Sequence, residues 1–419
     1  MNSIEKLIEE LCPEGVEFRE IQELFEIRNG YTPSTSNKSY WTNGTVPWFR
    51  MEDIRGNGRI LDDSIRKISA EAVKGGNTFP ANSIIVATSA TIGEHALITV
   101  SHLSNQRFTS MSLKPAFVPA LDMKFIFYYC FLLGKWCTKN TSASSFASVN
   151  MSSFRKFKFP IPPLEIQNKI VNILDSFTEL EAELEAELEA RRRQYAYYRN
   201  TLLAFEASKL EDAMVWEKLE SVGRLYAGLS GKAKSDFLSG NANFISYINV
   251  FKNIDADLCA EDRVFIKEGE KQNTIQLGDI LFTGSSEVPE EVGMSSVVTQ
   301  EPTQRTYLNS FCFGFRLNDS NLLHPGFSKH LFRSSSIRQQ IIGTANGVTR
   351  FNISKERFKK IKIPIPPLAE QIRIAAILDQ FDALVNDLSI GLPAEIRARR
   401  QQYEHYRNRL LTFREAAQP

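Results

Sequence analysis

The sequence has few residues that bind metals or form disulfides. Only five of its 419 residues are cysteine, no two of them are spaced as a Cys-x-x-Cys pair, and its five histidines are scattered. Zinc sites in proteins are usually built from closely spaced pairs of such ligands. An odd number of thiols in a chain of this size is typical of a reducing compartment. The pattern therefore predicts a cytoplasmic protein without a metal site.

Signals for membrane insertion and secretion are also lacking. The longest uninterrupted apolar run, Phe125 to Leu133, is far shorter than the roughly 20 residues of a spanning helix. The N-terminus contains Glu5, Glu9 and Glu10, which do not suit a signal peptide. The formal net charge is only +1, so overall charge does not by itself indicate a nucleic-acid partner.

No catalytic or cofactor-binding motif is complete. Gly231 and Lys232 resemble the end of a phosphate-binding loop, but Tyr226 replaces its first glycine and Ala233 replaces its Ser/Thr. Also absent are the Asn/Asp-Pro-Pro-aromatic motif of amino-methyltransferases, a glycine-rich dinucleotide turn, His-Glu-x-x-His and the Pro-Asp dipeptide of nucleases. A triad assembled only in space has no such signature. We predict no catalytic residue, bound cofactor or metal in this chain.

The sequence does contain a long internal repeat. A Pro-Ile-Pro-Pro-Leu motif opens each copy and a Tyr-x-x-Tyr-Arg-Asn-x-Leu-Leu motif closes it, at residues 160–164 and 195–203 and again at residues 364–368 and 403–411. Between the motifs, Gln167 matches Gln371, and the apolar residues that follow keep the same offset of 204. The chain is therefore an internal duplication.

Each repeat is predicted to form a long helix, here called a rod. Proline cannot continue a helix but suits the first turn of a new one. After residue 164, apolar residues recur at steps of three and four, the spacing of a coiled-coil seam. Between residues 179 and 190 the tetrapeptide Glu-Leu-Glu-Ala occurs three times, and its residues favour helix. Residues 164–205 would extend over roughly 60 Å, which is too long for the apolar stripe to be buried against one small domain, so the second rod, residues 368–413, is the expected partner.

The second rod differs from the first in one place. Its offset grows from 204 to 208 before Tyr403, so four residues have been added around residues 389–393. Gly391 and Pro393 should interrupt the helix there, and we expect the second rod in two pieces. Residues 3–11 form another amphipathic pattern, predicted to be a short helix near the C-terminal end of that rod.

The regions before the rods repeat more faintly. Trp48 and Phe49 match Phe244 and Ile245, and residues 83–86 match residues 279–282 in a short buried-strand pattern. The loops between these matches differ, which is typical of two binding heads with different specificity. We predict an α+β fold with two pseudo-repeated, mixed α/β heads joined by two long coiled-coil helices. The predicted parts are residues 1–159, 160–211, 212–363 and 364–419.

Charge is distributed unevenly between heads and rods. From Arg28 to Lys158 there are sixteen Lys or Arg against seven Asp or Glu, and from Pro302 to Ile363 eleven against two. Residues 160–211 carry six against ten. Two basic blocks separated by an acidic rod favour two heads that bind an anionic polymer.

The doubled rod pattern resembles the specificity subunit of type I restriction–modification systems. The resemblance covers the whole chain in its architecture, and the stretch from Gly391 to Phe413 is typical of that family's distal helical region. It implies that each head is a target recognition domain reading one half of a split, asymmetric DNA site. It also implies that the rods pair as two long antiparallel coiled-coil helices, set the spacing of the heads and carry two methyltransferase subunits.

The resemblance assigns the chemistry of DNA modification to other subunits. In that family the methyltransferase subunits bind S-adenosylmethionine and methylate adenine, and a restriction subunit uses ATP and Mg²⁺ to cut DNA. The chain itself would be a DNA-binding subunit without an active site. Head sequences vary freely in the family, so the DNA target is not implied.

Base reading needs side chains that can hydrogen-bond to base edges. We predict that Arg and Lys in polar loops do this, namely Lys38, Arg50, Arg55 and Arg107 in the first head and Lys232, Lys234, Arg305 and Arg350 in the second. Lys359 and Lys360, in a basic run, suit phosphate contacts better than base contacts. The alternative for each is a solvated surface charge.

Repeated polar and aromatic residues on the rods are the candidate contacts for partner subunits. These are Gln167, Tyr195, Tyr198 and Arg199 and their copies Gln371, Tyr403, Tyr406 and Arg407. Alternatively, they belong only to the seam and flanks of a self-contained coiled coil.

Two other hypotheses remain open from the sequence. A protein-binding scaffold would have two lobes on a spacer and no affinity for DNA, whereas salt-dependent binding to duplex DNA would exclude it. A self-sufficient modification enzyme lacks its expected motifs here, and methyl transfer by the isolated chain would be needed to support it.

Overall fold

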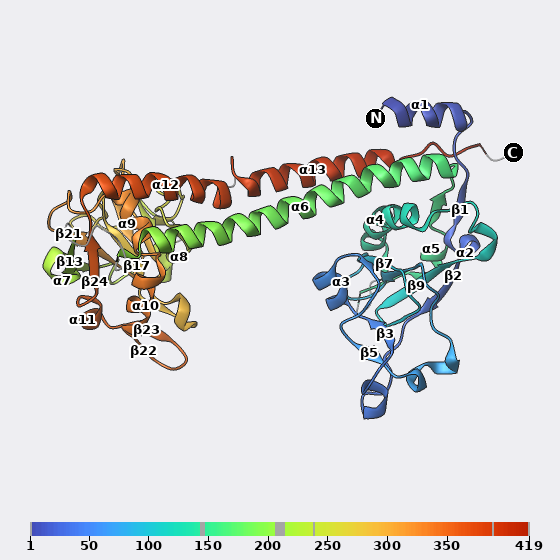
Figure 1. The fold of residues 1–419 in the computed structure, drawn as a ribbon, viewed down its shortest axis with the longest axis horizontal. Helices are drawn as coiled ribbons and strands as arrows, with labels where there is room; N and C mark the ends of the chain where they lie inside the picture. Colours follow the sequence, from blue (N-terminus) through green and yellow to red (C-terminus); the bar gives the residue numbers. More distant parts are fainter. Residues whose placement is uncertain (1, 143–146, 206–213, 238, 388, 418–419) are drawn as a thin grey trace. The chain divides into compact units, whose positions relative to one another are not determined.

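The computed structural model describes residues 2–142, 147–205, 214–237, 239–387 and 389–417. The chain divides into two compact units. The first unit is Met1–Glu183 with Ile396–Pro419, and the second unit is Leu184–Glu395. Each unit holds one head with short strands and helices, together with part of the rods (Figure 1).

The first head is built on one larger sheet and several small ones. The five-stranded sheet has the order β2 (Phe25–Asn29), β9 (Phe108–Leu113), β6 (Ser83–Ala87), β7 (His95–Ile98) and β4 (Ile60–Leu61). A second sheet contains β5 (Lys67–Ile68), β3 (Val46–Phe49) and β8 (Leu103–Ser104). The two-stranded pairs are β1 (Phe18–Glu20) with β12 (Lys158–Pro160) and β10 (Thr141–Ser142) with β11 (Ser148–Val149).

Five α-helices complete the described part of the first head. They are α1 (Asn2–Leu11), α2 (Ile21–Leu24), α3 (Met51–Asn57), α4 (Met123–Lys139) and α5 (Met151–Arg155). The side chain of Asp122 caps α4 by accepting hydrogen bonds from the backbone N–H groups of Lys124 and Phe125. The apolar side chains of α4 lie in one core with Ile166 and Ile170 from the start of α6 (Leu164–Leu202). The first head is therefore fixed to the rod by a shared hydrophobic core.

The second head repeats this plan. Its main sheet has the order β14 (Gly223–Ala227), β21 (Cys312–Leu317), β17 (Ile280–Thr283) and β19 (Ser295–Val297). Smaller sheets contain β16 (Arg263–Val264), β15 (Ala242–Ile245) and β20 (Thr306–Leu308), then β18 (Ser285–Ser286), β23 (Phe351–Ile353) and β22 (Ala345–Asn346), and finally β13 (Val215–Lys218) and β24 (Lys362–Ile365). The helices are α7 (Leu219–Val222), α8 (Tyr247–Lys252), α9 (Pro325–Leu331), α10 (Ser335–Gly343) and α11 (Lys355–Phe358).

Strand pairing confirms that the heads are copies of one framework. Trp48 and Phe49 lie in β3, which runs parallel to β8, and their matches Phe244 and Ile245 lie in β15, which runs parallel to β20. The buried strand pattern predicted at residues 83–86 falls on β6, and the pattern predicted at residues 279–282 overlaps β17, which begins one residue later at Ile280. Each of these strands pairs with two strands of its main sheet.

The rods have the predicted continuity. The helix α6 is unbroken over 39 residues, as expected from its apolar period. The second rod is interrupted between α12 (Leu368–Asn386) and α13 (Leu392–Leu410), where four residues were inferred to have been added. A side chain at Gly391 would place a Cβ 2.5 Å from the carbonyl oxygen of Ala383, so the chain turns where only glycine fits.

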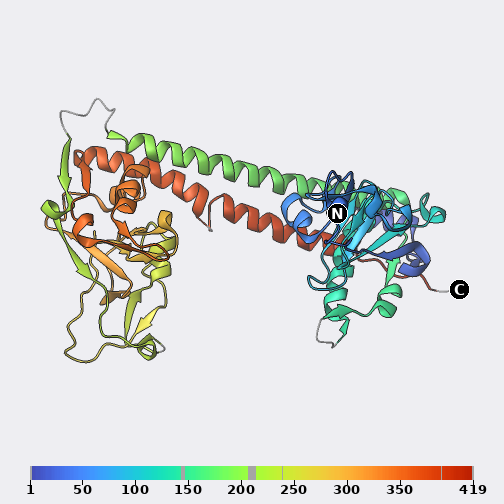
Figure 2. The same cartoon turned by 90° about the horizontal axis from the view of Figure 1, so that it is seen from below.

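Within each unit the rod segments pair antiparallel, as predicted. In the first unit Phe177 on α6 packs against Tyr403 and Tyr406 on α13. Glu181, one turn later on α6, pairs at 2.5 Å with Arg400, which is earlier on α13, so the two helices run in opposite directions. In the second unit the end of α6 lies beside α12 in both views (Figure 1, Figure 2), with Tyr198 stacked on Phe381.

The two ends of the chain meet in the first unit. The Arg409 guanidinium pairs with Glu5 of α1 at 2.5 Å. The N–H of Val16 donates to the carbonyl of Arg414 at 2.8 Å, and the N–H of Ala416 donates back to Val16 at 2.9 Å. Gly15 has φ of +101°, and a Cβ there would lie 2.8 Å from the Arg414 carbonyl oxygen. The predicted position of the short N-terminal helix is thus confirmed.

The boundary predicted between residues 211 and 212 lies outside the described residues. None of the described helices combines the length and the apolar character needed to cross a bilayer.

Candidate nucleic-acid interface

The four cations predicted in the first head have different surroundings. Lys38, Arg55 and Arg107 are exposed, and within the described residues their side-chain nitrogens make no hydrogen bond or ion pair. Arg50 is half-buried, because its guanidinium lies 5.8 Å from the centre of the Trp48 ring and 3.8 Å from Glu52. Three of the four side chains are therefore available to a ligand without breaking a contact.

The start of α3 shows how this region is held in place. Buried Asp53 accepts hydrogen bonds of 2.6 Å from the backbone N–H groups of both Arg50 and Ile65. One carboxylate thus fixes the entry to α3 and the loop after β4. Arg55 projects from the last turn of this anchored helix.

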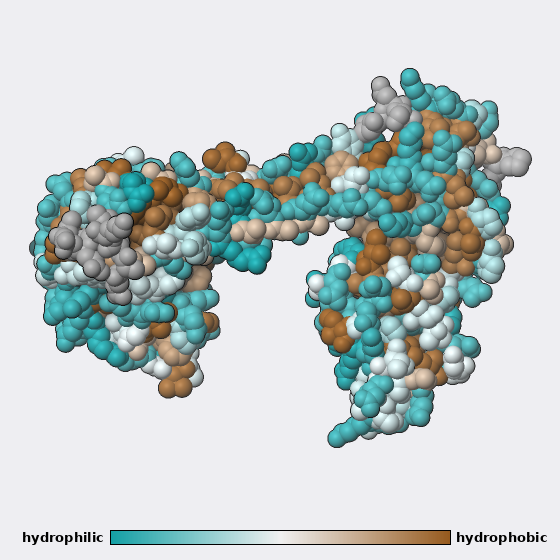
Figure 3. Space-filling view, in the orientation of Figure 1, coloured by the Kyte–Doolittle hydropathy of each residue, from teal (hydrophilic) through white to brown (hydrophobic). Residues whose placement is uncertain are grey.

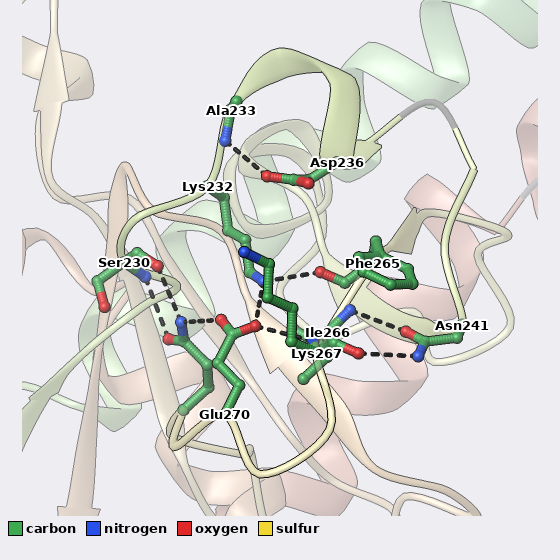
Figure 4. Close-up of polar contacts among 10 residues, drawn as sticks. Ser230, Lys232, Ala233, Asp236, Asn241, Phe265, Ile266, Lys267 and Glu270 are labelled. Carbon is green, nitrogen blue, oxygen red and sulfur yellow. Dashed lines mark hydrogen bonds and ion pairs between the residues drawn. The ribbon is translucent and has the colours of Figure 1, made fainter.

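In the second head, Lys232 is not a surface residue. Its side chain is only 4 % exposed, and its ammonium group donates to Glu270 at 2.6 Å and to the carbonyl of Phe265 at 2.7 Å (Figure 4). The hydrogen bonds from Lys232 and Gln272 lower the pKa of Glu270 to about 2. This burial argues against base reading by Lys232 and gives it a structural role in the loop.

Neighbouring bonds make the same loop rigid. The Asp236 carboxylate accepts from the N–H of Ala233, and the Asn241 amide bonds to both the N–H and the carbonyl of Ile266 (Figure 4). Lys234 is exposed on the short 3-10 helix that follows Ala233. The internal ion pair of Lys232 therefore supports the segment that displays Lys234.

The remaining predicted cations of the second head lie on its surface. Arg305 and Lys360 are exposed and, among the described residues, have no side-chain partner. Lys359 is half-buried and donates to Glu356 one turn earlier, at 3.1 Å. Arg350 is exposed but oriented by Ser285, whose hydroxyl accepts from Nη2 at 3.1 Å.

The visible face of each head is mainly hydrophilic, and its apolar patches are small (Figure 3).

Gln167 and Gln371 hold the heads to the rods. Gln167 is 0 % exposed, donates to the carbonyls of Ala120 and Pro162, and accepts from the N–H of Asp122. Gln371 is 1 % exposed and makes the equivalent three bonds in the second unit, to Leu322, Pro366 and His324. We call this arrangement the glutamine clasp. Its burial argues against the predicted partner contact for both glutamines.

The repeated tyrosines and arginines of the rods are partly buried. Tyr195 is 7 % exposed, and its hydroxyl lies 3.2 Å from His330. Arg199 lies over the Tyr195 ring at 5.2 Å, and Arg407, which is 7 % exposed, lies over the Tyr403 ring at 5.1 Å. Arg407 also lies over the Phe131 ring of α4 at 4.0 Å, so Tyr195 and Arg407 contact the heads, whereas Arg199 and Tyr403 contact residues of their own helix in these pairs.

Tyr198 and Tyr406 make matching contacts on the rods. Each stacks on the phenylalanine of the opposite helix, with ring centroids 5.1 Å apart for Tyr198 and Phe381 and 5.6 Å apart for Tyr406 and Phe177. Tyr198 keeps 38 % of its surface exposed. It therefore combines a seam contact with a surface that another protein could cover.

Comparison with known proteins identifies the family. Residues 13–190 and 218–398 each match the type I restriction modification DNA specificity domain. The specificity subunit of the type I restriction enzyme EcoprrI from Escherichia coli is 38 % identical over 400 residues, covering 93 % of this chain and 92 % of its own length. The chain belongs to the type I restriction–modification specificity family.

Other specificity-family proteins support the same assignment. The specificity subunit of EcoR124I/EcoR124II from Escherichia coli is 31 % identical over 310 residues, covering 70 % of this chain and 71 % of its own. A solved structure described in terms of complex assembly of the type I restriction–modification system has a TM-score of 0.66 at 17 % identity, covering 95 % of this chain and 97 % of its own. The latter likeness shows a shared fold.

Comparing the two units of this family member reveals residues that sequence reasoning did not single out. Asp175 on α6 accepts from the hydroxyl of Tyr128 at 2.6 Å and pairs with Lys124 at 2.8 Å. Its copy Asp379 on α12 pairs with His330 at 2.6 Å and with Lys329 at 2.9 Å. Asp175 and Asp379 are separated by the same offset of 204 as the repeated glutamines, but their partners differ in sequence, so only the structure shows that both join rod to head.

We expect Gln371→Ala to destabilise the second unit by about 2–3 kcal/mol, because buried N–H and carbonyl groups lose their partners. Denaturant unfolding of the full chain measures the loss of free energy. Gln380→Ala is the matched control, since Gln380 is exposed on the same helix and should change stability by no more than about 0.5 kcal/mol. Equal losses in both variants would contradict the structural role of the clasp.

The described residues contain no group of three or more His, Cys, Asp or Glu that could hold a metal ion.

Proposed function

We propose that this chain is the DNA-sequence-specificity subunit of a type I restriction–modification complex, with each head reading one half of a split, asymmetric site. The observation that carries the proposal is the duplication of one head framework with different exposed loops. The proposed heads are residues 1–159 and 212–363. Residues 160–211 and 364–419 are the helical regions that set the spacer between half-sites.

Exposed cations support DNA as the ligand of both heads. Phosphate contacts supply affinity without sequence information, whereas Arg and Lys at base edges supply specificity. Arg55 and Arg107 in the first head, and Lys234, Arg305 and Arg350 in the second, combine exposure with attachment to ordered elements. Lys359 and Lys360 suit the phosphate backbone, since they belong to a basic helix end rather than a varied loop.

The same proposal assigns partners to the rods. Two methyltransferase subunits would dock on the helical regions, bind S-adenosylmethionine and methylate adenine, while restriction subunits supply ATP- and Mg²⁺-dependent cleavage. The exposed part of Tyr198, together with Tyr197, which is 65 % exposed, offers an aromatic surface for such docking. Action on cellular DNA places the proposed complex in the cytoplasm.

Binding of the reconstituted complex to duplex DNA tests the proposal. The affinity should fall steeply between about 50 and 200 mM salt, because phosphate contacts release counterions. A protein-binding scaffold would show no such binding. Methyl transfer by this chain without its partners would instead support a self-sufficient enzyme and contradict the proposal.

We expect Arg107→Ala to relax the sequence requirement of one half-site and leave the other unchanged. Loss of a base contact costs about 1–3 kcal/mol of discrimination. The measurement is the set of genomic sites methylated by the complex carrying the variant. The side chain of Arg107 is exposed and makes no hydrogen bond or ion pair among the described residues, so its removal should not affect folding.

Arg19→Ala is the control for this variant. It removes one positive charge from the same head, but Arg19 already pairs with Glu17 at 2.6 Å. The half-site sequence should therefore stay unchanged. If Arg107→Ala lowers methylation equally at all sites, Arg107 contacts phosphate and does not read a base.

A further inference from the structure

The hairpin formed by β22 and β23 projects polar and apolar side chains from the second head. β23 pairs with β22 on one side and with β18 on the other, so the base of the hairpin is fixed in a small sheet. The four residues of its tip, Gly347 to Arg350, are all exposed. Gly347 has φ of +129°, and a Cβ there would lie 2.0 Å from the Arg350 carbonyl oxygen, so the tight turn requires glycine.

Two arginines stabilise the hairpin through hydrogen bonds. Arg357 of α11 donates to the carbonyl of Ala345 at 3.3 Å and to the side chain of Asn346. Arg350 donates from Nε and Nη2 to the hydroxyl of Ser285, at 3.3 and 3.1 Å. The hairpin is therefore held before any ligand binds, which reduces the entropy lost on binding.

The contact with Ser285 leaves one edge of the Arg350 guanidinium free. Nε and Nη2 form the side edge of the group, and that edge is occupied. The end edge, which carries one N–H of each Nη atom, has no partner within the described residues. A pair of parallel N–H donors of this kind matches the O6 and N7 acceptors of guanine in the major groove.

Val348 is an unusual residue for the tip of a solvent-exposed hairpin. It is 90 % exposed and β-branched, and it packs against none of the described hydrophobic clusters. Its exposed methyl groups therefore contribute nothing visible to folding. In the major groove, the apolar group that a base presents to such a side chain is the thymine methyl.

A pocket beside the hairpin combines Arg350 with two carboxylates. It has a volume of about 480 Å³ and includes Arg350, Phe311, Tyr247, Glu287 and Glu291 in its lining. Phe311 is 61 % exposed, and Arg350 lies 5.9 Å from the centre of its ring. Two carboxylates beside the arginine would repel a phosphate, but a carboxylate can accept a hydrogen bond from the amino group of cytosine.

The charge around the hairpin suits DNA as a whole. Residues 345–362 contain six Lys or Arg and a single acidic residue, Glu356. Cations such as Lys360 can bind the phosphate backbone of DNA. The pocket, which contains both positive and negative side chains, lies next to the guanidinium that would contact the bases. This surface therefore has one region suited to phosphate contacts, which would position the DNA, and another suited to contacts with base edges.

We propose that the β22–β23 hairpin is the base-reading element of the second head. Arg350 reads a guanine through its free end edge, and Val348 contacts a neighbouring thymine methyl in the major groove. This inference rests on the proposed function, because it assigns a part of the proposed DNA surface to particular bases. It predicts that the second half-site contains a guanine and a thymine close together.

The test compares the genomic sites methylated by complexes carrying this chain, Arg350→Ala or Val348→Ser. Arg350→Ala should lower discrimination for guanine at one position of one half-site by about 10- to 100-fold, and Val348→Ser should lower discrimination for thymine at a nearby position of the same half-site. The other half-site should keep its sequence. Lys252→Ala is the control, since Lys252 is exposed in a cleft lined by aspartates and should change neither half-site.

The outcomes separate this inference from the proposed function. If the unaltered complex methylates no split site, the proposed function fails. If it does, but Arg350→Ala keeps its guanine or reduces methylation equally at all sites, the hairpin does not read bases and only this inference is overturned. If a thermal melt shows that Arg350→Ala is unfolded, the Val348→Ser variant alone tests the inference, because the Val348 side chain packs against none of the described hydrophobic clusters. An unchanged thymine requirement would then refute the inference.

Discussion

Insertion of a fourth Glu-Leu-Glu-Ala copy into α6 is expected to lengthen the non-specific spacer of the DNA site by one to two base pairs. Four residues add ~6 Å to a helix, and base pairs are stacked at ~3.4 Å. The half-site sequences should not change, because neither head is altered. Deletion of one copy should shorten the spacer by the same step.

The structure explains why this block tolerates a change of length. Leu180, Leu184 and Leu188 are each partly buried along one side of α6, while most of the glutamates between them are exposed. A step of four residues is close to the 3.6 residues of one turn, so a new copy keeps its leucine near the seam. The residual rotation is about 40°, which the twist of the duplex can partly absorb.

Mapping methylated sites for chains with two, three and four copies measures the effect. Glu183→Gln is the matched control, since it alters charge in the block without altering length, and its spacer should remain that of the parent chain. A spacer that stays fixed while the half-site sequences change would show that the central rod does not determine spacing.

Replacement of residues 16–159 by the equivalent part of another specificity subunit is expected to change one half-site completely and leave the other intact. The heads have separate cores. The first contains clusters around Phe49 and Trp48, and the second contains clusters around Val250 and Phe244 that share no residue with them. Each head can therefore fold and bind without the side chains of the other.

The glutamine clasp makes such an exchange practicable. Gln167 remains in the chain and bonds to the main-chain groups of residues 120 and 122, not to side chains that differ between heads. A new head that keeps this backbone turn can make the same bonds. The control is a replacement by the chain's own residues 16–159 through the same junctions, which should preserve the site. Changes in both half-sites would show that the heads do not read independently.

The parts of the fold that depend on periodic sequence patterns were predictable. The apolar spacing after residue 164 correctly predicted the helix α6, and the prolines before Leu164 predicted where it starts. The inserted Gly391 correctly predicted the interruption between α12 and α13. The strands β6 and β17 were visible as short apolar runs. These features are local, because a few residues decide them without reference to the rest of the chain.

Features that depend on distant partners could not be predicted. Lys232 was assigned to the surface because nothing near it in sequence signals that Glu270, 38 residues later, would bury its charge. The repeated glutamines were assigned to partner binding because repetition shows that a position matters without showing what it contacts. Each glutamine bonds to one carbonyl five residues earlier, in its own proline motif, and to two backbone groups 45 to 49 residues away, which have no sequence signature.

The most direct test of the account is the methylation pattern of a genome exposed to this chain together with its methyltransferase subunits. We expect one split motif, with N6-methyladenine in both half-sites, a fixed non-specific spacer, and two half-sites of unrelated sequence. An uninterrupted motif, or methylation without any sequence preference, would contradict the claim that two heads each read half of one site.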